Sequence, residues 1–194
     1  LVRDGHSVAV LDDLSTGRLE NLAESRSRVD WMPGDIRDRK AVASAVAGAQ
    51  AVFHLAALAA VARSVENPVE VTEVNVNGTL NVLLASHEAG VRRVVYASSS
   101  SVYGDVATLP KTESMPLSPR SPYAATKAAG EAFLSAFTGS YGLETVALRY
   151  FNVFGPRQSP RSLYAAVVPR FVDAALAGRS PVVWMAGNSS ASMP

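Results

Sequence analysis

Two short apolar runs, Ala51-Val52-Phe53-His54-Leu55 and Val94-Val95-Tyr96-Ala97-Ser98, stand on either side of a long stretch with helical periodicity. Continuous apolar runs of this length are typical of strands buried in a parallel sheet. Between them, Pro68 begins a helix that we expect to continue to about Ala89, where Gly90 ends it. A strand, a helix and a strand in this order predict a right-handed crossover with the two strands parallel.

The same alternation continues toward both ends of the chain. Further strands are predicted at 7–11, 29–32, 145–149 and 181–184, and further helices at 38–46, 122–141 and 165–177. The polar stretch that follows Gly17 favours helix to about Ser27. We therefore expect an α/β fold built on a doubly wound, mostly parallel sheet with helices on both faces.

Composition excludes several classes of protein. The 194 residues include 18 Lys and Arg against 17 Asp and Glu, and this balance argues against a binder of nucleic acid. The chain has no cysteine and only three scattered histidines, so we expect no metal site. The most apolar stretch, 51–62, is too short to cross a membrane, and we expect neither a membrane partner nor a targeting segment.

Polar and small residues gather where the predicted strands end. Ligands of such sheets bind beyond the carboxyl ends of the strands, so these positions are the candidate site. They are Asp12, Asp13, Asp35, Ile36, Leu55, Ala56, Ala57, Ser98 to Ser100, and Tyr150 to Asn152. A carboxylate such as Asp12 could accept both hydroxyls of an adenosine ribose, although Asp12-Asp13 could equally be a turn or a helix cap.

Tyr123 and Lys127 are four residues apart on the helix predicted at 122–141, which makes them neighbours on one face. A phenol is a poor base at neutral pH, and a nearby ammonium group stabilises the phenolate. Ser99 follows a predicted strand, where its hydroxyl could bind the same substrate oxygen from which Tyr123 takes a proton. The alternative is a surface tyrosine with a solvated lysine, and a polar loop of four serines.

The sequence resembles the extended short-chain dehydrogenases/reductases, in particular the NAD-dependent nucleotide-sugar epimerases and dehydratases. The similarity covers the chain to about Trp184. It rests on the segments 10–17, 34–38, 52–57, 75–79, 98–104, 121–123 with Lys127, and 148–158. It implies a Rossmann-type fold and NAD as cofactor.

The resemblance also implies a role for each candidate residue. Ser99, Tyr123 and Lys127 would be catalytic, and Tyr123 and Lys127 would also contact NAD. Asp12 and Asp13 would lie at the adenosine ribose, Asp35 and Ile36 at the adenine, and Leu55, Ala56, Ala57 and Tyr150 at the nicotinamide. Asn75 would fix the neighbouring strand ends and the cofactor. Ser99, Ser100, Tyr123 and Asn152 would contact the substrate.

Within the family, the sequence is most similar to 4-epimerases of UDP-sugars. The 4,6-dehydratases carry Thr-Asp-Glu where this chain has Ser99-Ser100-Ser101, and serines cannot supply that acid pair. UDP-glucuronate decarboxylases share much of the pattern and are the alternative, together with other NAD-dependent nucleotide-sugar dehydratases or reductases. A catalytically inactive dinucleotide-binding fragment is the alternative outside enzymes.

Two family features are missing from the sequence. We find neither the Gly-x-x-Gly-x-x-Gly turn with its preceding strand nor the expected segment with an arginine near residue 188. We therefore expect a sheet without its first strand, in a chain that by itself aggregates or binds NAD poorly. Residues 1–154 would be an NAD-binding domain, and residues 155–194 the beginning of a substrate-binding region. The family further implies a cytoplasmic homodimer that associates through the helices at 69–89 and 122–141.

Overall fold

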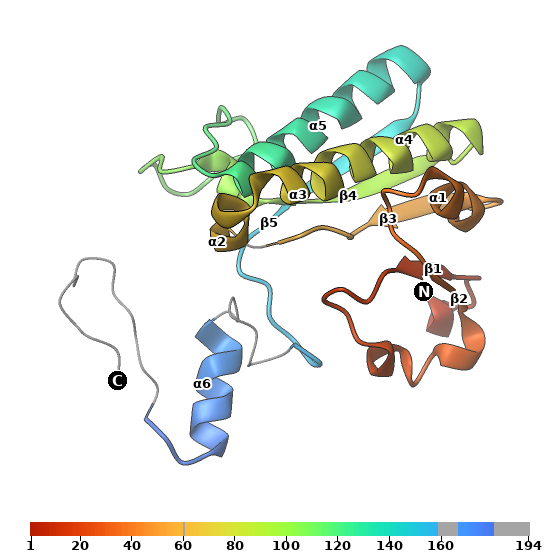
Figure 1. The fold of residues 1–194 in the computed structure, drawn as a ribbon. Helices are drawn as coiled ribbons and strands as arrows, with labels where there is room; N and C mark the ends of the chain where they lie inside the picture. Colours follow the sequence, from red (N-terminus) through yellow and green to blue (C-terminus); the bar gives the residue numbers. More distant parts are fainter. Residues whose placement is uncertain (60, 159–166, 181–194) are drawn as a thin grey trace. The chain divides into compact units, whose positions relative to one another are not determined.

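The computed structural model describes residues 1–59, 61–158 and 167–180. They divide into two compact units, Leu1–Phe151 and Asn152–Pro194. The strands are β1 (Ala9–Asp12), β2 (Asp30–Pro33), β3 (Ala51–His54), β4 (Arg93–Ser99) and β5 (Glu144–Tyr150). The α-helices are α1 (Arg39–Val46), α2 (Val61–Glu66), α3 (Pro68–Thr72), α4 (Gly78–Glu88), α5 (Pro122–Tyr141) and α6 (Val167–Leu176) (Figure 1).

All described strand pairs are parallel, as the sequence predicts. They form two separate sheets, one of β1 and β2 and one in the order β3-β4-β5. A Rossmann-type sheet without its first strand divides in this way, because that strand would lie between β1 and β3. The strand predicted at 181–184 lies outside the described residues.

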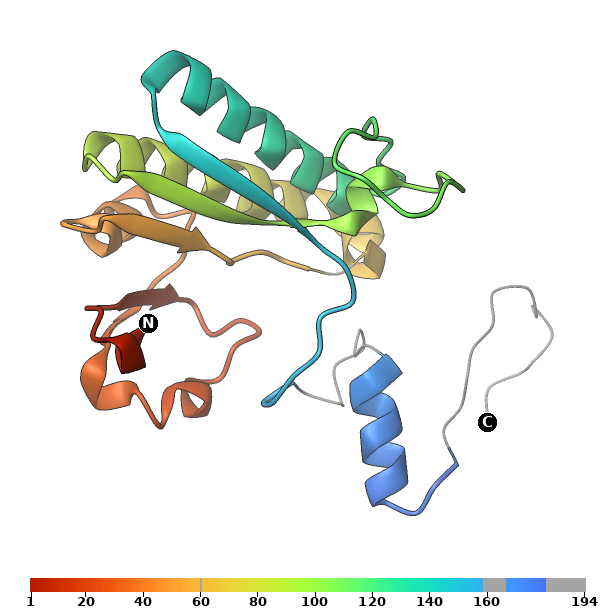
Figure 2. The same cartoon turned by 180° about the vertical axis from the view of Figure 1, so that it is seen from behind.

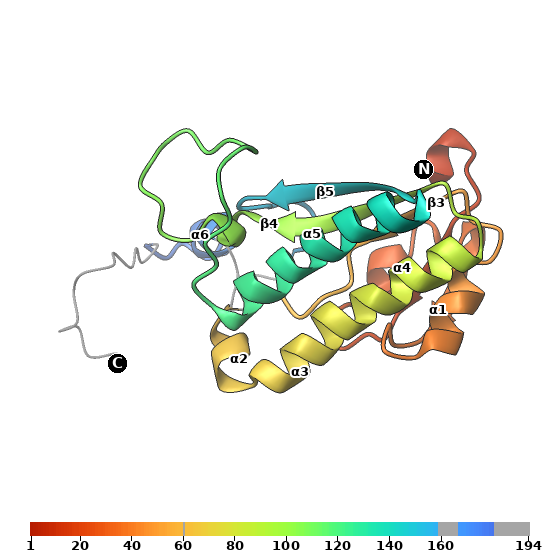
Figure 3. The same cartoon turned by 90° about the horizontal axis from the view of Figure 1, so that it is seen from above.

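Helices α3, α4 and α5 lie along one face of the three-stranded sheet (Figures 1 and 3). The core under them includes Val94 and Tyr96 from β4, Leu83 from α4, and Leu134 and Phe137 from α5. Within the first unit, the opposite sheet face is open and carries Phe53, Val146 and Leu148, which are 53%, 39% and 39% exposed (Figure 2). In the part of this unit that the structure describes, the parallel strands are flanked by helices, as the sequence predicts.

Residues Pro68 to Glu88 do not form the single α-helix that was predicted. The segment η4 (Glu73–Asn77) between α3 and α4 is a π-helix, which holds one more residue in its turn than an α-helix. One smaller prediction was also wrong, because the stretch after Gly17 forms two 3-10 turns, η2 (Leu19–Leu22) and η3 (Arg26–Arg28). Helix α2 was not predicted.

The N-terminus of α5 is well specified by its sequence. The Ser121 hydroxyl accepts a hydrogen bond from the Ala124 amide at 3.1 Å, and Pro122 occupies the first turn, where its missing N–H is not needed. Gly142 ends the helix in the left-handed conformation, with φ 70°. These signals fix the bounds of the helix that carries Tyr123 and Lys127.

Candidate active site

The first turn of α5 and the carboxyl end of β4 bring Tyr123 and Ser99 together. Burial raises the pKa of the Tyr123 phenol, and a hydrogen bond with Ser99 acts in the opposite direction. The Ser99 hydroxyl accepts hydrogen bonds from the amide and the hydroxyl of Ser101, at 3.2 and 2.9 Å. Because both lone pairs of Ser99 are occupied, its proton is available for donation. Ser100 is half-buried and begins the short helix η5 (Ser100–Tyr103).

Lys127 lies one turn further along α5 and is only 3% exposed. Its ammonium group donates a hydrogen bond to the Ala97 carbonyl at 2.8 Å and lies 5.9 Å from the centroid of the Tyr123 ring. Burial lowers the pKa of Lys127 to about 8. The pair predicted from its four-residue spacing therefore shares a buried environment, and the surface alternative does not hold for Lys127.

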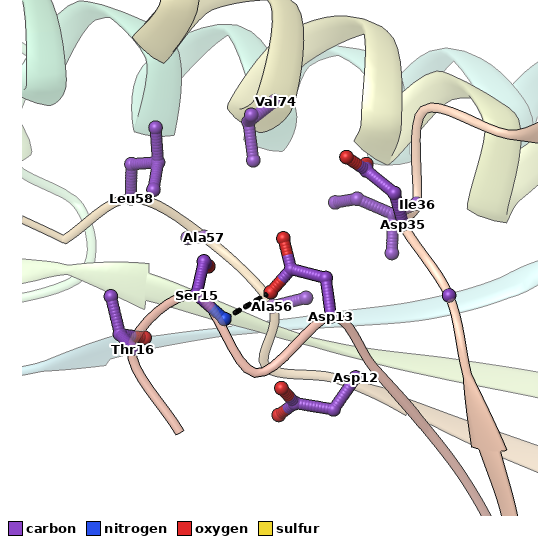
Figure 4. A pocket seen from close by; sticks show the side chains of 11 residues that line it. Asp12, Asp13, Ser15, Thr16, Asp35, Ile36, Ala56, Ala57, Leu58 and Val74 are labelled. Atoms are coloured by element: carbon purple, nitrogen blue, oxygen red, sulfur yellow. Dashed lines mark hydrogen bonds between the residues drawn. The ribbon is translucent and has the colours of Figure 1, made fainter. Parts of the chain in front are cut away.

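A pocket lies at the carboxyl ends of β1, β2 and β3 (Figure 4). It is lined by Asp12, Asp13, Ser15, Thr16, Gly34, Asp35, Ile36, Ala56, Ala57, Leu58 and Val74. Leu55, which was predicted beside these residues, is 64% exposed and does not line the pocket.

The carboxylates of the pocket are held in place by local hydrogen bonds. Asp12 accepts from the Leu14 amide at 2.7 Å, and Asp13 from the Ser15 amide at 2.9 Å. Asp35 accepts from the Arg37 side chain, and this hydrogen bond is the main reason that the pKa of Asp35 is lowered. Both the turn and the ligand interpretation of Asp12-Asp13 are compatible with this geometry.

The pocket fits one end of a dinucleotide. Carboxylates at a strand end can accept ribose hydroxyls, and the methyl side chains of Ala56 and Ala57 leave room for a ligand beside the backbone. Among the described residues, no group of three or more His, Cys, Asp or Glu side chains could hold a metal ion.

Asn75, in η4, is 1% exposed and forms hydrogen bonds with Leu58, one of the residues that line the pocket. Its side-chain oxygen accepts from the Leu58 amide at 2.8 Å, and its NH₂ group donates to the Leu58 carbonyl at 3.2 Å and to the Thr126 hydroxyl at 3.1 Å. Thr126 in turn donates to the Tyr123 carbonyl. Asn75 therefore ties the loop after β3 to the helix of Tyr123.

Two candidates lie at the end of β5. Tyr150 pairs with Ser99 in the sheet register and is 41% exposed. Asn152 is exposed and belongs to the second unit. The structure thus brings Ser99, Tyr123 and Lys127 together in the first unit, with Tyr150 on the neighbouring strand.

Sequence reasoning missed several buried groups around Lys127. Tyr96 lies 4.8 Å under the Lys127 ammonium group, measured to the ring centroid, and His54 contacts Tyr96. Glu131 accepts hydrogen bonds from Ser98 and Arg149, at 2.5 and 2.8 Å. The spacing of Lys127 and Glu131 places both on one face of α5 and could have indicated a polar stripe.

Comparison with known proteins matches residues 1–192 to the NAD dependent epimerase/dehydratase family. The chain belongs to this family. A similar curated relative is the UDP-glucose 4-epimerase of Mycolicibacterium smegmatis, 43% identical over 194 residues, which cover 98% of this chain and 62% of the relative. Family membership accounts for the parallel sheets.

Two solved structures of family members are also similar. The UDP-N-acetylglucosamine 4-epimerase from Methanobrevibacter ruminantium, in complex with UDP-N-acetylmuramic acid, is 42% identical with a TM-score of 0.88, over 93% of this chain and 58% of that one. The Thermus thermophilus UDP-glucose 4-epimerase, in complex with NAD, is 43% identical with a TM-score of 0.84, over 92% of this chain and 57% of that one. This chain therefore spans little more than half the length of these relatives.

No helix in the described part of this family member is long and apolar enough to cross a membrane.

Proposed function

We propose that the protein containing this chain is a 4-epimerase of a UDP-sugar, with NAD as its cofactor. The observation that carries the proposal is the convergence of Tyr123 and Ser99 beside a buried Lys127. The similarity to enzymes named UDP-glucose and UDP-N-acetylglucosamine 4-epimerase supports the choice of substrate.

The chemistry divides between the cofactor and the protein. When bound, NAD supplies a reversible acceptor for the hydride at C4 of the sugar. Tyr123, as phenolate, takes the proton of the 4-hydroxyl and later returns it. Ser99 donates a hydrogen bond to that oxygen, and the charge of Lys127 favours the phenolate. Because NAD would take up and give back the same hydride, no net oxidation would result, and Tyr123 would restore the proton of the 4-hydroxyl in the epimer.

The serines after β4 narrow the reaction class. Elimination of water from the sugar needs an acid and a base at this place, and Ser100 and Ser101 carry neither. The Ser101 hydroxyl is moreover engaged with Ser99 at 2.9 Å. We therefore favour epimerisation over dehydration.

The test is an epimerase assay on the protein that contains these residues, together with whatever its gene encodes on either side. With UDP-galactose or UDP-N-acetylgalactosamine we expect the C4 epimer, and we expect Tyr123→Phe to lower kcat by about 10²-fold or more. Ser44→Ala, which removes an exposed hydroxyl from α1, is the control and keeps its activity. Carbon dioxide released from UDP-glucuronate would point to a decarboxylase instead. NAD binding without any turnover would point to a non-catalytic protein.

A homodimer in the cytoplasm is part of the same proposal. Residues 69–89 and 122–141 would form the contact, and the apolar side chains of Val69 and Tyr141 on these segments are 67% and 51% exposed. Light scattering would show twice the protomer mass, and cell fractionation tests the location. We also assign NAD binding to residues 1–154 and the beginning of the substrate region to residues 155–194.

A further inference from the structure

Lys127 is a buried cation whose carboxylate neighbour is engaged elsewhere. Glu131, one turn further along α5, pairs with Arg149 at 2.8 Å. Among the described residues, no carboxylate forms an ion pair with Lys127, and its one hydrogen bond goes to the Ala97 carbonyl. A buried ammonium group without a counter-charge is unstable unless other groups replace its lost hydration.

The aromatic ring of Tyr96 takes the place of part of this lost hydration. The Lys127 ammonium group lies 4.8 Å from the centroid of the Tyr96 ring, within the range of cation–π attraction, which strengthens where the cation is desolvated. Tyr96 is 1% exposed, so the contact is shielded from water.

The ring of Tyr96 is held in this place by the fold. Tyr96 points from β4 toward α5, and a Cβ atom at Gly130 would lie 2.4 Å from its hydroxyl oxygen. The helix therefore needs glycine where it crosses the ring. Burial raises the pKa of the Tyr96 hydroxyl, and the Thr79 side chain acts in the opposite direction. The ring face of Tyr96 is directed at the Lys127 ammonium group.

We propose that Tyr96 is a positioning residue that holds the Lys127 ammonium group beside Tyr123 through its ring face, in place of a carboxylate. The inference deepens the proposed function, because the value of a fixed, charged Lys127 rests on the role of Tyr123 as the proton acceptor. It concerns only side chains of this chain and does not require bound NAD.

The other titratable groups around Lys127 set the background for a test. His54, from β3, contacts Tyr96, and burial together with the charge of Lys127 lowers its pKa to about 3, so that it is neutral. Tyr123 is on the same helix, and Glu131 is paired with Arg149. Since burial lowers the pKa of Lys127 to about 8, its titration falls in an accessible range.

The test is a direct titration of Lys127 by NMR. In the protein that contains these residues, selective ¹³C labelling of the lysine ε carbons gives separate signals, among them those of Lys40, Lys111 and Lys127, and the Lys127 signal is assigned by its loss in Lys127→Arg. Tyr96→Phe keeps the ring and should leave the pKa unchanged. Tyr96→Leu should lower it by about one unit, a tenfold change in acid dissociation constant that corresponds to about 1.36 kcal/mol.

Site-specific replacement of Tyr96 by a trifluorinated phenylalanine guards against a folding defect in Tyr96→Leu. This ring matches phenylalanine closely in shape but has a depleted π face, and it should lower the pKa of Lys127 as well. Unchanged Lys40 and Lys111 signals report an intact fold. The proposal is overturned if the fluorinated ring leaves the pKa unchanged, or if Tyr96→Phe lowers it as far as Tyr96→Leu. Failure of the epimerase proposal would leave this titration intact, so the two outcomes can be told apart.

Discussion

Acid should weaken this fold through a single buried histidine. His54 is 4% exposed, and its Nε2 atom lies 2.8 Å from the hydroxyl oxygen of Thr79. The Thr79 hydroxyl donates its own proton to the Asn75 carbonyl, at 2.6 Å, so it must accept from His54. His54 is therefore the neutral tautomer with the proton on Nε2.

The sign and size of the effect follow from proton binding. Burial, with the charge of Lys127, lowers the pKa of His54 from 6.5 to about 3 in the folded chain. Below pH 6.5 the unfolded chain binds a proton that the folded chain rejects, so acid favours unfolding. At about pH 5 the loss of stability from His54 alone is about 2 kcal/mol, and the loss continues to grow as the pH approaches 3.

Urea unfolding followed by circular dichroism, at several values between about pH 7 and about pH 5, measures this loss. His54→Gln is the comparison, because its amide can still donate to Thr79 but does not titrate. The variant should lose about 2 kcal/mol less than the wild type over this interval. His6 and His87 are exposed and remain in both proteins. If wild type and variant lose the same stability, His54 is not the neutral buried group described above.

Three further predictions, on Gly130, Asn75 and Glu131, test the packing and hydrogen bonding around the candidate site. Gly130→Ala should lower the free energy of unfolding by about 1–3 kcal/mol, because its Cβ atom would meet the Tyr96 ring. Gly139→Ala is the control: nothing lies within 4 Å of its Cβ atom, and it should raise that free energy by about 0.5–1 kcal/mol. Urea unfolding measures both changes. Asn75→Ala should lower the free energy of unfolding by about 3 kcal/mol in the same assay, because it removes three buried hydrogen bonds. A loss below about 1 kcal/mol would contradict the conclusion that Asn75 ties the loop after β3 to α5. Burial raises the pKa of Glu131, but the hydrogen bonds from Arg149 and Ser98 outweigh burial, so the pKa in the folded chain lies below 4.5. The carboxylate of Glu131 therefore stabilises the fold above pH 4.5, and this stabilisation disappears as the pH falls. Glu131→Gln should lower the free energy of unfolding by about 2 kcal/mol near neutral pH but by little in acid.

The elements whose ends carry strong local signals were predicted well from the sequence. Helix α5 has the predicted bounds Pro122–Tyr141, because Ser121-Pro122 and Gly142 act through neighbouring backbone atoms alone. Strands β3, β4 and β5 were predicted to within one residue at each end, since apolar runs between polar turns mark them. The proximity of Tyr123 and Lys127 could also be predicted, because it depends only on their four-residue spacing within a helix.

Tertiary contacts explain what the sequence did not reveal. Alternation along β4 could place Tyr96 inside, but only the docking of α5 puts it under Lys127. The hydrogen bond between Asn75 and Thr126 joins residues that are 51 positions apart, and no local sequence pattern predicts it. The π-helical turn of η4 has no distinctive composition either.

That turn makes the length of the chain between residues 73 and 77 a sensitive quantity. Each residue of an α-helix advances the side chains by about 100°. Val71 and Thr79 are 0% and 1% exposed and eight residues apart, and the wide turn of η4 lets both face the interior. Deleting Glu73 or Val74 would restore a regular helix with the two residues seven positions apart, about 700° and therefore nearly the same direction, so both would stay inside. Asn75 would then follow Val71 by three residues in place of four, and its amide would turn by about 100° relative to Val71. We therefore expect such a deletion to spare the core but to break the hydrogen bonds of Asn75 to Leu58 and Thr126.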